Sequence, residues 1–172
     1  LEHALVAFKQ RGAVNLPPVR YDAMAGFTTE SMLGLLGGSL QPLVDLIAKG
    51  SVRGVAALVG CTTVREYQSG DHITTLAREL IKRNILVIGA GCCSGAMQND
   101  GLMSKDAAQL AGSGLAGVCG ALGVPPCLSY GSCTDIGKII GTAVALGDAL
   151  GVDLCDLPIV ASAPEYMEQK AV

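Results

Sequence analysis

Short, mostly apolar stretches alternate with longer amphipathic stretches along this chain of 172 residues. Each apolar stretch is four to six residues long and is bounded by glycine, proline or polar residues, which is typical of strands buried on both faces. Sheets with two buried faces are usually parallel and covered by helices. The predicted strands cover residues 54–59, 85–88, 127–130 and 157–161.

The amphipathic stretches predict helices before, between and after these strands. Ile73, Leu76 and Leu80, for example, recur at the spacing that places side chains on one face of a helix. The predicted helices cover residues 1–12, 28–36, 40–49, 72–83, 135–150 and 164–172, with shorter helical pieces between residues 92 and 122. Candidate N-caps are Thr28 or Thr29, Ser39 and Asp71.

Strands and helices in this alternation predict parallel β-α-β units with right-handed connections. We therefore expect an α/β fold, a Rossmann-like open parallel sheet with helices on both faces, in one domain over residues 1–172. The chain begins with Leu1 rather than Met and has no signal-peptide pattern, so we expect a soluble interior fragment of a longer chain.

The composition excludes several classes of protein. Half of the residues are hydrophobic and 16% are charged, which excludes an intrinsically disordered chain. Aromatic residues make up 3% and the net charge is -3, so we expect no nucleic acid partner. No apolar run reaches the roughly 18 residues of a membrane-spanning helix, so we expect no membrane span. The glycine-rich stretch 89–95 lacks the third glycine of a dinucleotide fingerprint, which argues against nucleotide binding.

Three of the four predicted strands end in a glycine that a cysteine follows within one or two residues. In a parallel sheet the carboxyl ends of the strands share one edge, where ligands characteristically bind. We therefore expect the three thiols to converge on one point. The sequences are Gly60-Cys61, Gly91-Cys92 and Gly131-Ser132-Cys133.

Converging thiols predict a metal centre, because soft thiolates select zinc, monovalent copper or iron-sulfur clusters. A zinc site usually has a closely paired Cys-x-x-Cys, which this chain lacks, whereas a large cluster accepts ligands scattered along the chain. Cys61, Cys92 and Cys133 are too few for a complete site, so further ligands must come from elsewhere. Cys93 is an alternative to Cys92.

The remaining cysteines are interpreted as small hydrophobic residues. Cys119 lies in an apolar helix, Cys127 lies within a strand, and Cys155 is assigned to packing as well. An odd total of seven cysteines does not predict a disulfide framework and favours a reducing, cytoplasmic compartment.

Motifs along nearly the whole chain resemble, in order and at compatible spacing, those of the catalytic subunit of nickel-dependent carbon monoxide dehydrogenases. No single motif decides the resemblance, but together they are specific. They include Leu36-Gly37-Gly38-Ser39, Val59-Gly60-Cys61, Asp100-Gly101-Leu102-Met103, Gly131-Ser132-Cys133-Thr134-Asp135 and Ala163-Pro164-Glu165-Tyr166-Met167-Glu168-Gln169-Lys170-Ala171-Val172.

The resemblance implies a role for four residues. By it, the chain is the carboxy-terminal Rossmann-like domain of a larger multidomain subunit that interconverts CO plus water with CO2, two protons and two electrons. Cys61 and Cys92 match ligands of iron in the nickel-iron-sulfur cluster, the C-cluster, and Cys133 matches the ligand of nickel. Lys170 matches the lysine that stabilises and protonates CO2.

The resemblance also implies partners and cofactors outside this chain. These are the remaining cysteine and histidine ligands, further 4Fe-4S clusters in the parent subunit, and a homodimer of that subunit. A ferredoxin-like electron carrier and an acetyl-CoA synthase are the implied protein partners, in an anaerobic organism. With an incomplete ligand set, we expect no catalysis from residues 1–172 alone.

Some positions depart from the family pattern. Thr62-Thr63 stands where the family usually has Asn-Asn, Ser129-Tyr130 stands in place of His-Met, and Gln169 replaces Glu before the lysine. We therefore expect altered hydrogen bonding around the cluster. Two alternatives stay open, a hybrid-cluster protein resembling hydroxylamine reductase and a non-catalytic, cluster-binding scaffold fragment.

Overall fold

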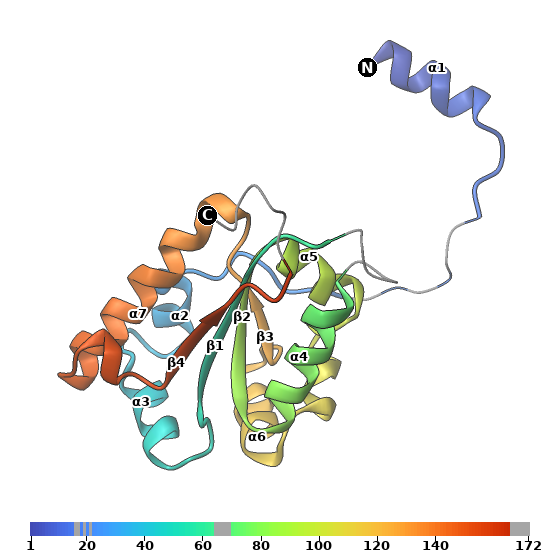
Figure 1. Cartoon of the computed structure of the whole chain (residues 1–172). Helices are drawn as coiled ribbons and strands as arrows, with labels where there is room; N and C mark the ends of the chain where they lie inside the picture. Colours follow the sequence, from blue (N-terminus) through green and yellow to red (C-terminus); the bar gives the residue numbers. More distant parts are fainter. Residues whose placement is uncertain (16–17, 19, 21, 64–69, 166–172) are drawn as a thin grey trace.

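The structure is a computed structural model of the chain, and it describes residues 1–15, 18, 20, 22–63 and 70–165. Four parallel strands form a sheet in the order β3-β2-β1-β4 (Figure 1). All four strands overlap the predicted ranges, and the predicted open parallel sheet is confirmed. The strands are β1 (Gly54–Gly60), β2 (Ile85–Gly91), β3 (Cys127–Ser129) and β4 (Ile159–Ser162).

Helices cover both faces of this sheet, as the sequence predicts (Figure 1). One face carries α4 (Asp71–Lys82), α5 (Cys92–Asn99) and α6 (Ser113–Leu122). The opposite face carries α2 (Thr29–Leu35), α3 (Gln41–Ala48) and α7 (Ile136–Leu150). The α/β, Rossmann-like class is therefore confirmed.

The remaining elements are short or lie apart from the sheet. Helix α1 (Glu2–Gln10) extends away from the sheet and has no buried residue (Figure 1). Three 3-10 helices complete the described chain, η1 (Lys105–Leu110), η2 (Cys133–Asp135) and η3 (Leu154–Asp156). In the described part of the chain, no helix combines the length and the apolar character that crossing a membrane requires.

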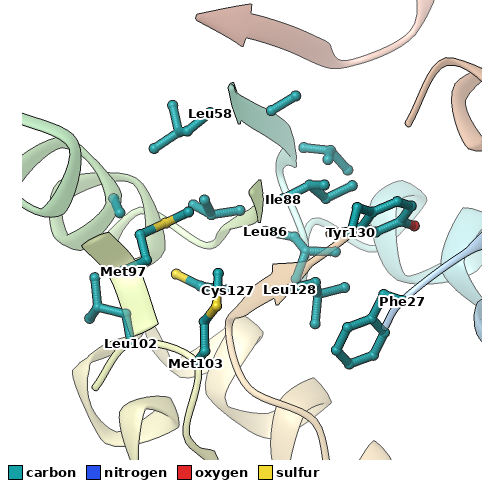
Figure 2. Close-up of a cluster of buried hydrophobic side chains, with 14 of the residues drawn as sticks. Phe27, Leu58, Leu86, Ile88, Met97, Leu102, Met103, Cys127, Leu128 and Tyr130 are labelled. Atoms are coloured by element: carbon teal, nitrogen blue, oxygen red, sulfur yellow. The ribbon is translucent and has the colours of Figure 1, made fainter. Parts of the chain in front are cut away.

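The core lies on both sides of the sheet because the strands present apolar side chains to both helix layers. Figure 2 shows Met97, Leu102 and Met103 on the side of α5, and Phe27 and Tyr130 on the opposite side. A second cluster joins α3 and α7 to the chain before β4, and its buried members are Leu36, Leu40, Leu43, Leu146 and Leu157.

Strand β2 is longer than predicted. The sequence predicts a break after Ile88, but pairing with β1 continues through Gly91. The side chain of Met97 fills the space beside Gly89, where any added side chain would collide with it. Glycine at this position therefore makes room for helix α5 rather than ending the strand.

The predicted cap of α4 is wrong. Asp71 is the first residue of the helix, and the cap position belongs to Gly70, which has a positive φ of 92°. The side chain of Glu165, which follows β4, accepts the amide hydrogens of this helix end. The cap is therefore supplied from a distant part of the chain.

Of the other two predicted caps, one is confirmed and one is wrong. Thr28 caps α2 with a reciprocal bond to Ser31. The predicted cap Ser39 is wrong, because α3 begins at Gln41 and its cap position belongs to Leu40, although the Gln41 amide still donates to the Ser39 hydroxyl at 3.1 Å. Of the helix predicted over 164–172, residues 166–172 lie outside the described residues, and Pro164 and Glu165 are not helical.

Candidate metal centre

The three strand ends that carry Gly-Cys sequences lie side by side at one edge of the sheet. Gly60 of β1 pairs in register with Gly91 of β2. The amide of Gly91 then donates to the carbonyl of Gly131, which follows β3, at 2.9 Å. The predicted shared edge is therefore present, with one cysteine following each of the three glycines.

Glycine is required at position 91 because two other segments approach its backbone closely. Gly91 has φ 75° and ψ -150°, a conformation that side chains other than hydrogen rarely tolerate. A Cβ atom there would lie 2.8 Å from the carbonyl oxygen of Gly60 and 3.4 Å from the Cβ of Cys133. The absence of this Cβ brings the Cys133 segment against the residue that precedes Cys92.

The three predicted ligands differ in exposure. Cys61 is 6% exposed, whereas Cys92 and Cys133 are exposed at the edge. All three are free thiols. Two accessible thiols and a buried third one therefore belong to segments that meet at this edge, where a ligand can approach from outside this chain.

Cys93 points into the protein rather than outward. Its thiol is fully buried and donates a weak hydrogen bond to the carbonyl of Cys61 at 3.8 Å. Burial, together with the nearby negative charge of Glu165, raises the pKa of the Cys93 thiol to about 12. Of the two adjacent cysteines, Cys92 is therefore the better placed to bind metal, and Cys93 holds the backbone of Cys61.

The loop that carries Cys133 is fixed by its own polar side chains. Ser132 and Asp135 form a reciprocal cap around η2, with the Ser132 amide 2.8 Å from the Asp135 carboxylate. Hydrogen bonds from Lys138 and then from Ser132 lower the pKa of Asp135 to about 2. These bonds hold the Cys133 backbone at the start of α7.

The donor set fits a multi-metal cluster better than a single ion. Among the residues that the structure describes, no three His, Cys, Asp or Glu side chains are grouped to hold one metal ion. A cluster with several metal atoms bridges thiols that are further apart, and the soft sulfur donors suit iron and nickel. Lys170, the fourth predicted site residue, lies outside the described residues.

The cysteines assigned to packing are buried in two cases of three. Cys119 and Cys127 are 1% and 0% exposed, and burial raises the pKa of both thiols. The assignment of Cys155 to the core is wrong, because this residue is exposed on η3, the surface segment between α7 and β4.

Sequence reasoning missed the role of Glu165. This carboxylate is buried at the same edge of the sheet and accepts three backbone amide hydrogens. A signal was present, since a glutamate directly follows Ala163-Pro164 at the end of the last strand. Its partners, however, lie far away in the sequence.

Comparison with known proteins gives matches over the whole chain. The sequence profile of the Prismane/CO dehydrogenase family matches residues 1–172. Carbon monoxide dehydrogenase 2 of Methanosarcina acetivorans is 50% identical over 99% of the chain, and carbon monoxide dehydrogenase of Archaeoglobus fulgidus is 45% identical over 99%. The chain spans 28% of the length of each of these relatives.

Solved structures match in the same way. A Ni-free carbon monoxide dehydrogenase from Thermococcus sp. AM4 superposes with a TM-score of 0.89 at 46% identity, over 94% of this chain and 26% of that one. An acetyl-CoA synthase/carbon monoxide dehydrogenase is described with NiZn[Fe4S4] and NiNi[Fe4S4] clusters in its alpha subunits. It superposes with a TM-score of 0.89 at 30% identity, over 99% of this chain and 27% of that one.

Proposed function

Because this chain belongs to the Prismane/CO dehydrogenase family, we propose that it holds one side of the nickel-iron-sulfur cluster of a carbon monoxide dehydrogenase. The observation that carries the proposal is the row of Gly60, Gly91 and Gly131, which brings three cysteine-bearing strand ends to one edge. The reaction is the interconversion of CO plus water with CO2, two protons and two electrons.

The three cysteines have distinct roles in this proposal. Cys61 and Cys92 hold iron atoms of the cluster, and Cys133 holds nickel. The exposure of Cys92 and Cys133 supports the assignment, since the rest of the cluster must be held from outside this chain. The bound cluster supplies the redox and Lewis-acid chemistry.

Lys170 contributes a positive charge and a proton. An ammonium group beside a developing carboxylate stabilises that negative charge, and it exchanges a proton with the reacting oxygen. The sequence supports this role, because Lys170 follows β4 in the chain and the carboxyl end of β4 lies at the edge of the sheet that also carries the ends of β1 and β2.

The longer subunit supplies what this chain lacks. We propose that the other cluster ligands and further 4Fe-4S clusters lie in the part of the subunit that the relatives have beyond the matched 28%. Dimerisation of that subunit, electron transfer to a ferredoxin-like carrier and a cytoplasmic, anaerobic setting belong to the same proposal. The similarity to an acetyl-CoA synthase/carbon monoxide dehydrogenase supports acetyl-CoA synthase as a further partner.

The hydroxylamine-reducing alternative gains no support from these comparisons. The named relatives and solved structures described above are carbon monoxide dehydrogenases or an acetyl-CoA synthase/carbon monoxide dehydrogenase. Nickel analysis of the purified protein separates the two activities.

The test substitutes Cys133 in the natural polypeptide that contains this chain, purified without oxygen. Cys133→Ala should remove nickel and CO oxidation together, because the nickel ligand is lost. Cys155→Ala is the matched control, since Cys155 is also exposed but lies on η3. Full nickel content in Cys133→Ala would refute the assigned role.

A second variant tests the lysine. Lys170→Ala should leave nickel and iron content unchanged and lower the turnover of CO, because it removes a proton donor and no ligand. Lys49→Ala, at an exposed lysine after α3, is the control. Undiminished turnover in Lys170→Ala would show that this residue takes no part in the reaction.

A further inference from the structure

Glu165 is a buried carboxylate at the edge of the sheet where the three cysteines lie. The residue is 2% exposed and lies three residues after Ser162, the last residue of β4. Its carboxylate accepts hydrogen bonds from the amides of Thr63 at 2.8 Å and of Gly70 and His72 at 3.2 Å each. A buried carboxylate needs such partners, because removing a charge from water is costly.

The three amides belong to two segments. Thr63 lies two residues after Cys61, whereas Gly70 and His72 lie at the start of α4. The amino end of a helix carries a partial positive charge that favours a carboxylate. One side chain therefore joins the backbone beyond Cys61 to the first turn of α4.

The backbone of Glu165 also packs against the end of β1. A Cβ atom on Gly60 would lie 3.6 Å from the carbonyl oxygen of Glu165, so the chain after β4 packs against the end of β1. On the other side, the Cys93 thiol donates to the carbonyl of Cys61. The backbone after the Cys61 Cα is thus held at two points, at the Cys61 carbonyl by Cys93 and at the Thr63 amide by Glu165.

We propose that Glu165 is a positioning residue of this edge. Its carboxylate fixes the backbone that carries the Cys61 thiol, and the same contacts anchor the start of the segment that reaches Lys170 five residues later. The carboxylate comes from 93 residues beyond His72 and also binds the Cys61 segment.

The first test measures the local structure in the metal-free natural polypeptide that contains this chain. Glu165→Gln removes the charge and places amide donors against backbone N–H groups. Hydrogen exchange at the amides of Thr63, Gly70 and His72 should become about tenfold faster or more, because their bonds to a charged acceptor are lost. Alkylation of Cys61 by iodoacetamide should accelerate to a similar extent, while Cys119 stays protected.

The controls separate this effect from a general loss of stability. Glu79→Gln changes an exposed carboxylate on α4, paired with Lys82 and Arg83, and should alter neither measurement. Glu165→Asp keeps the charge and should restore part of the protection. If Glu165→Gln does not fold, Glu165→Asp carries the test, since its shorter side chain cannot reach all three amides. Unchanged exchange and alkylation in the variant that folds would overturn the proposal.

The second test uses the metal-loaded polypeptide and rests on the proposed function. Glu165→Gln should lower kcat for CO oxidation about tenfold with KM for CO unchanged, because it displaces the segment leading to Lys170 and removes no group that binds CO. An unchanged kcat would overturn the link between Glu165 and Lys170. If hydrogen exchange becomes faster in Glu165→Gln but the unaltered polypeptide holds no nickel, the proposed function fails and the positioning of Cys61 by Glu165 stands.

Discussion

Substitution of Gly91 should destabilise the edge of the sheet where the three cysteine-bearing segments meet. Alanine would have to adopt φ 75° and ψ -150°, which costs about 1–3 kcal/mol. Its Cβ would also lie 2.8 Å from the Gly60 carbonyl oxygen and 3.4 Å from the Cys133 Cβ. Both neighbours are held by the sheet or by η2, so relief of this overlap costs about 1–3 kcal/mol more.

The expected loss for Gly91→Ala is therefore about 2–6 kcal/mol in the free energy of unfolding. Urea unfolding followed by circular dichroism measures it. Gly95→Ala is the matched control, since Gly95 is exposed within α5 and a Cβ there meets nothing within 4 Å. That variant should be more stable by about 0.5–1 kcal/mol, because alanine is the better helix former. Equal or higher stability of Gly91→Ala would refute the close approach of the three strand ends.

Three further predictions concern stability. Leu58→Ala should lower the free energy of unfolding by about 2–5 kcal/mol, because Leu58 is 1% exposed in the core. Val160→Ala, the control at a residue that is 57% exposed, should change it by less than about 0.5 kcal/mol. Equal urea midpoints for the two variants would contradict this prediction. Thr28→Ala should cost about 1 kcal/mol by the same assay, since it removes the reciprocal cap of α2. Burial raises the pKa of the Cys119 thiol from 9.0 to about 11, so this thiol ionises at lower pH in the unfolded chain than in the folded one. Its contribution to the free energy of unfolding is therefore complete below pH 9 and is lost as pH rises through 11. The contribution is about 2–3 kcal/mol, and unfolding at about pH 8 and about pH 10.5 should show a smaller fall in stability for Cys119→Ala than for the unaltered chain.

The sheet could be predicted from the sequence because its strands are buried on both faces. Such strands give unbroken apolar runs, as in residues 85–88, and the helices between them show a clear apolar face. The end of β2 could not be predicted in this way. Gly89 and Gly91 favour a break by their local properties, and their places in the strand depend on Met97 and Cys133, which approach them in the folded chain.

The sequence also predicts that the three cysteine-bearing segments share one edge, because parallel strands end at the same edge and each of these cysteines follows a strand end. The choice between Cys92 and Cys93 could not be predicted in this way. Consecutive helical residues point in different directions, and which of them faces the core depends on how α5 packs. The structure turns Cys93 inward and leaves Cys92 exposed.

Long-range polar contacts were the least predictable feature. Asp71 is of a residue type that is favoured at helix caps, yet Glu165 holds the start of α4 from 93 residues beyond His72. No pattern within a short window contains both partners of such a bond. Similarly, Cys155 lies in a stretch with apolar neighbours, but that stretch forms η3 on the surface.

Anomalous diffraction at the iron and nickel absorption edges tests the central claim most directly. Crystals of the natural polypeptide that contains this chain, grown without oxygen, should show iron signals next to the sulfur atoms of Cys61 and Cys92 and a nickel signal next to that of Cys133. Metal signals elsewhere in the protein, with these three thiols unbound, would contradict the proposal.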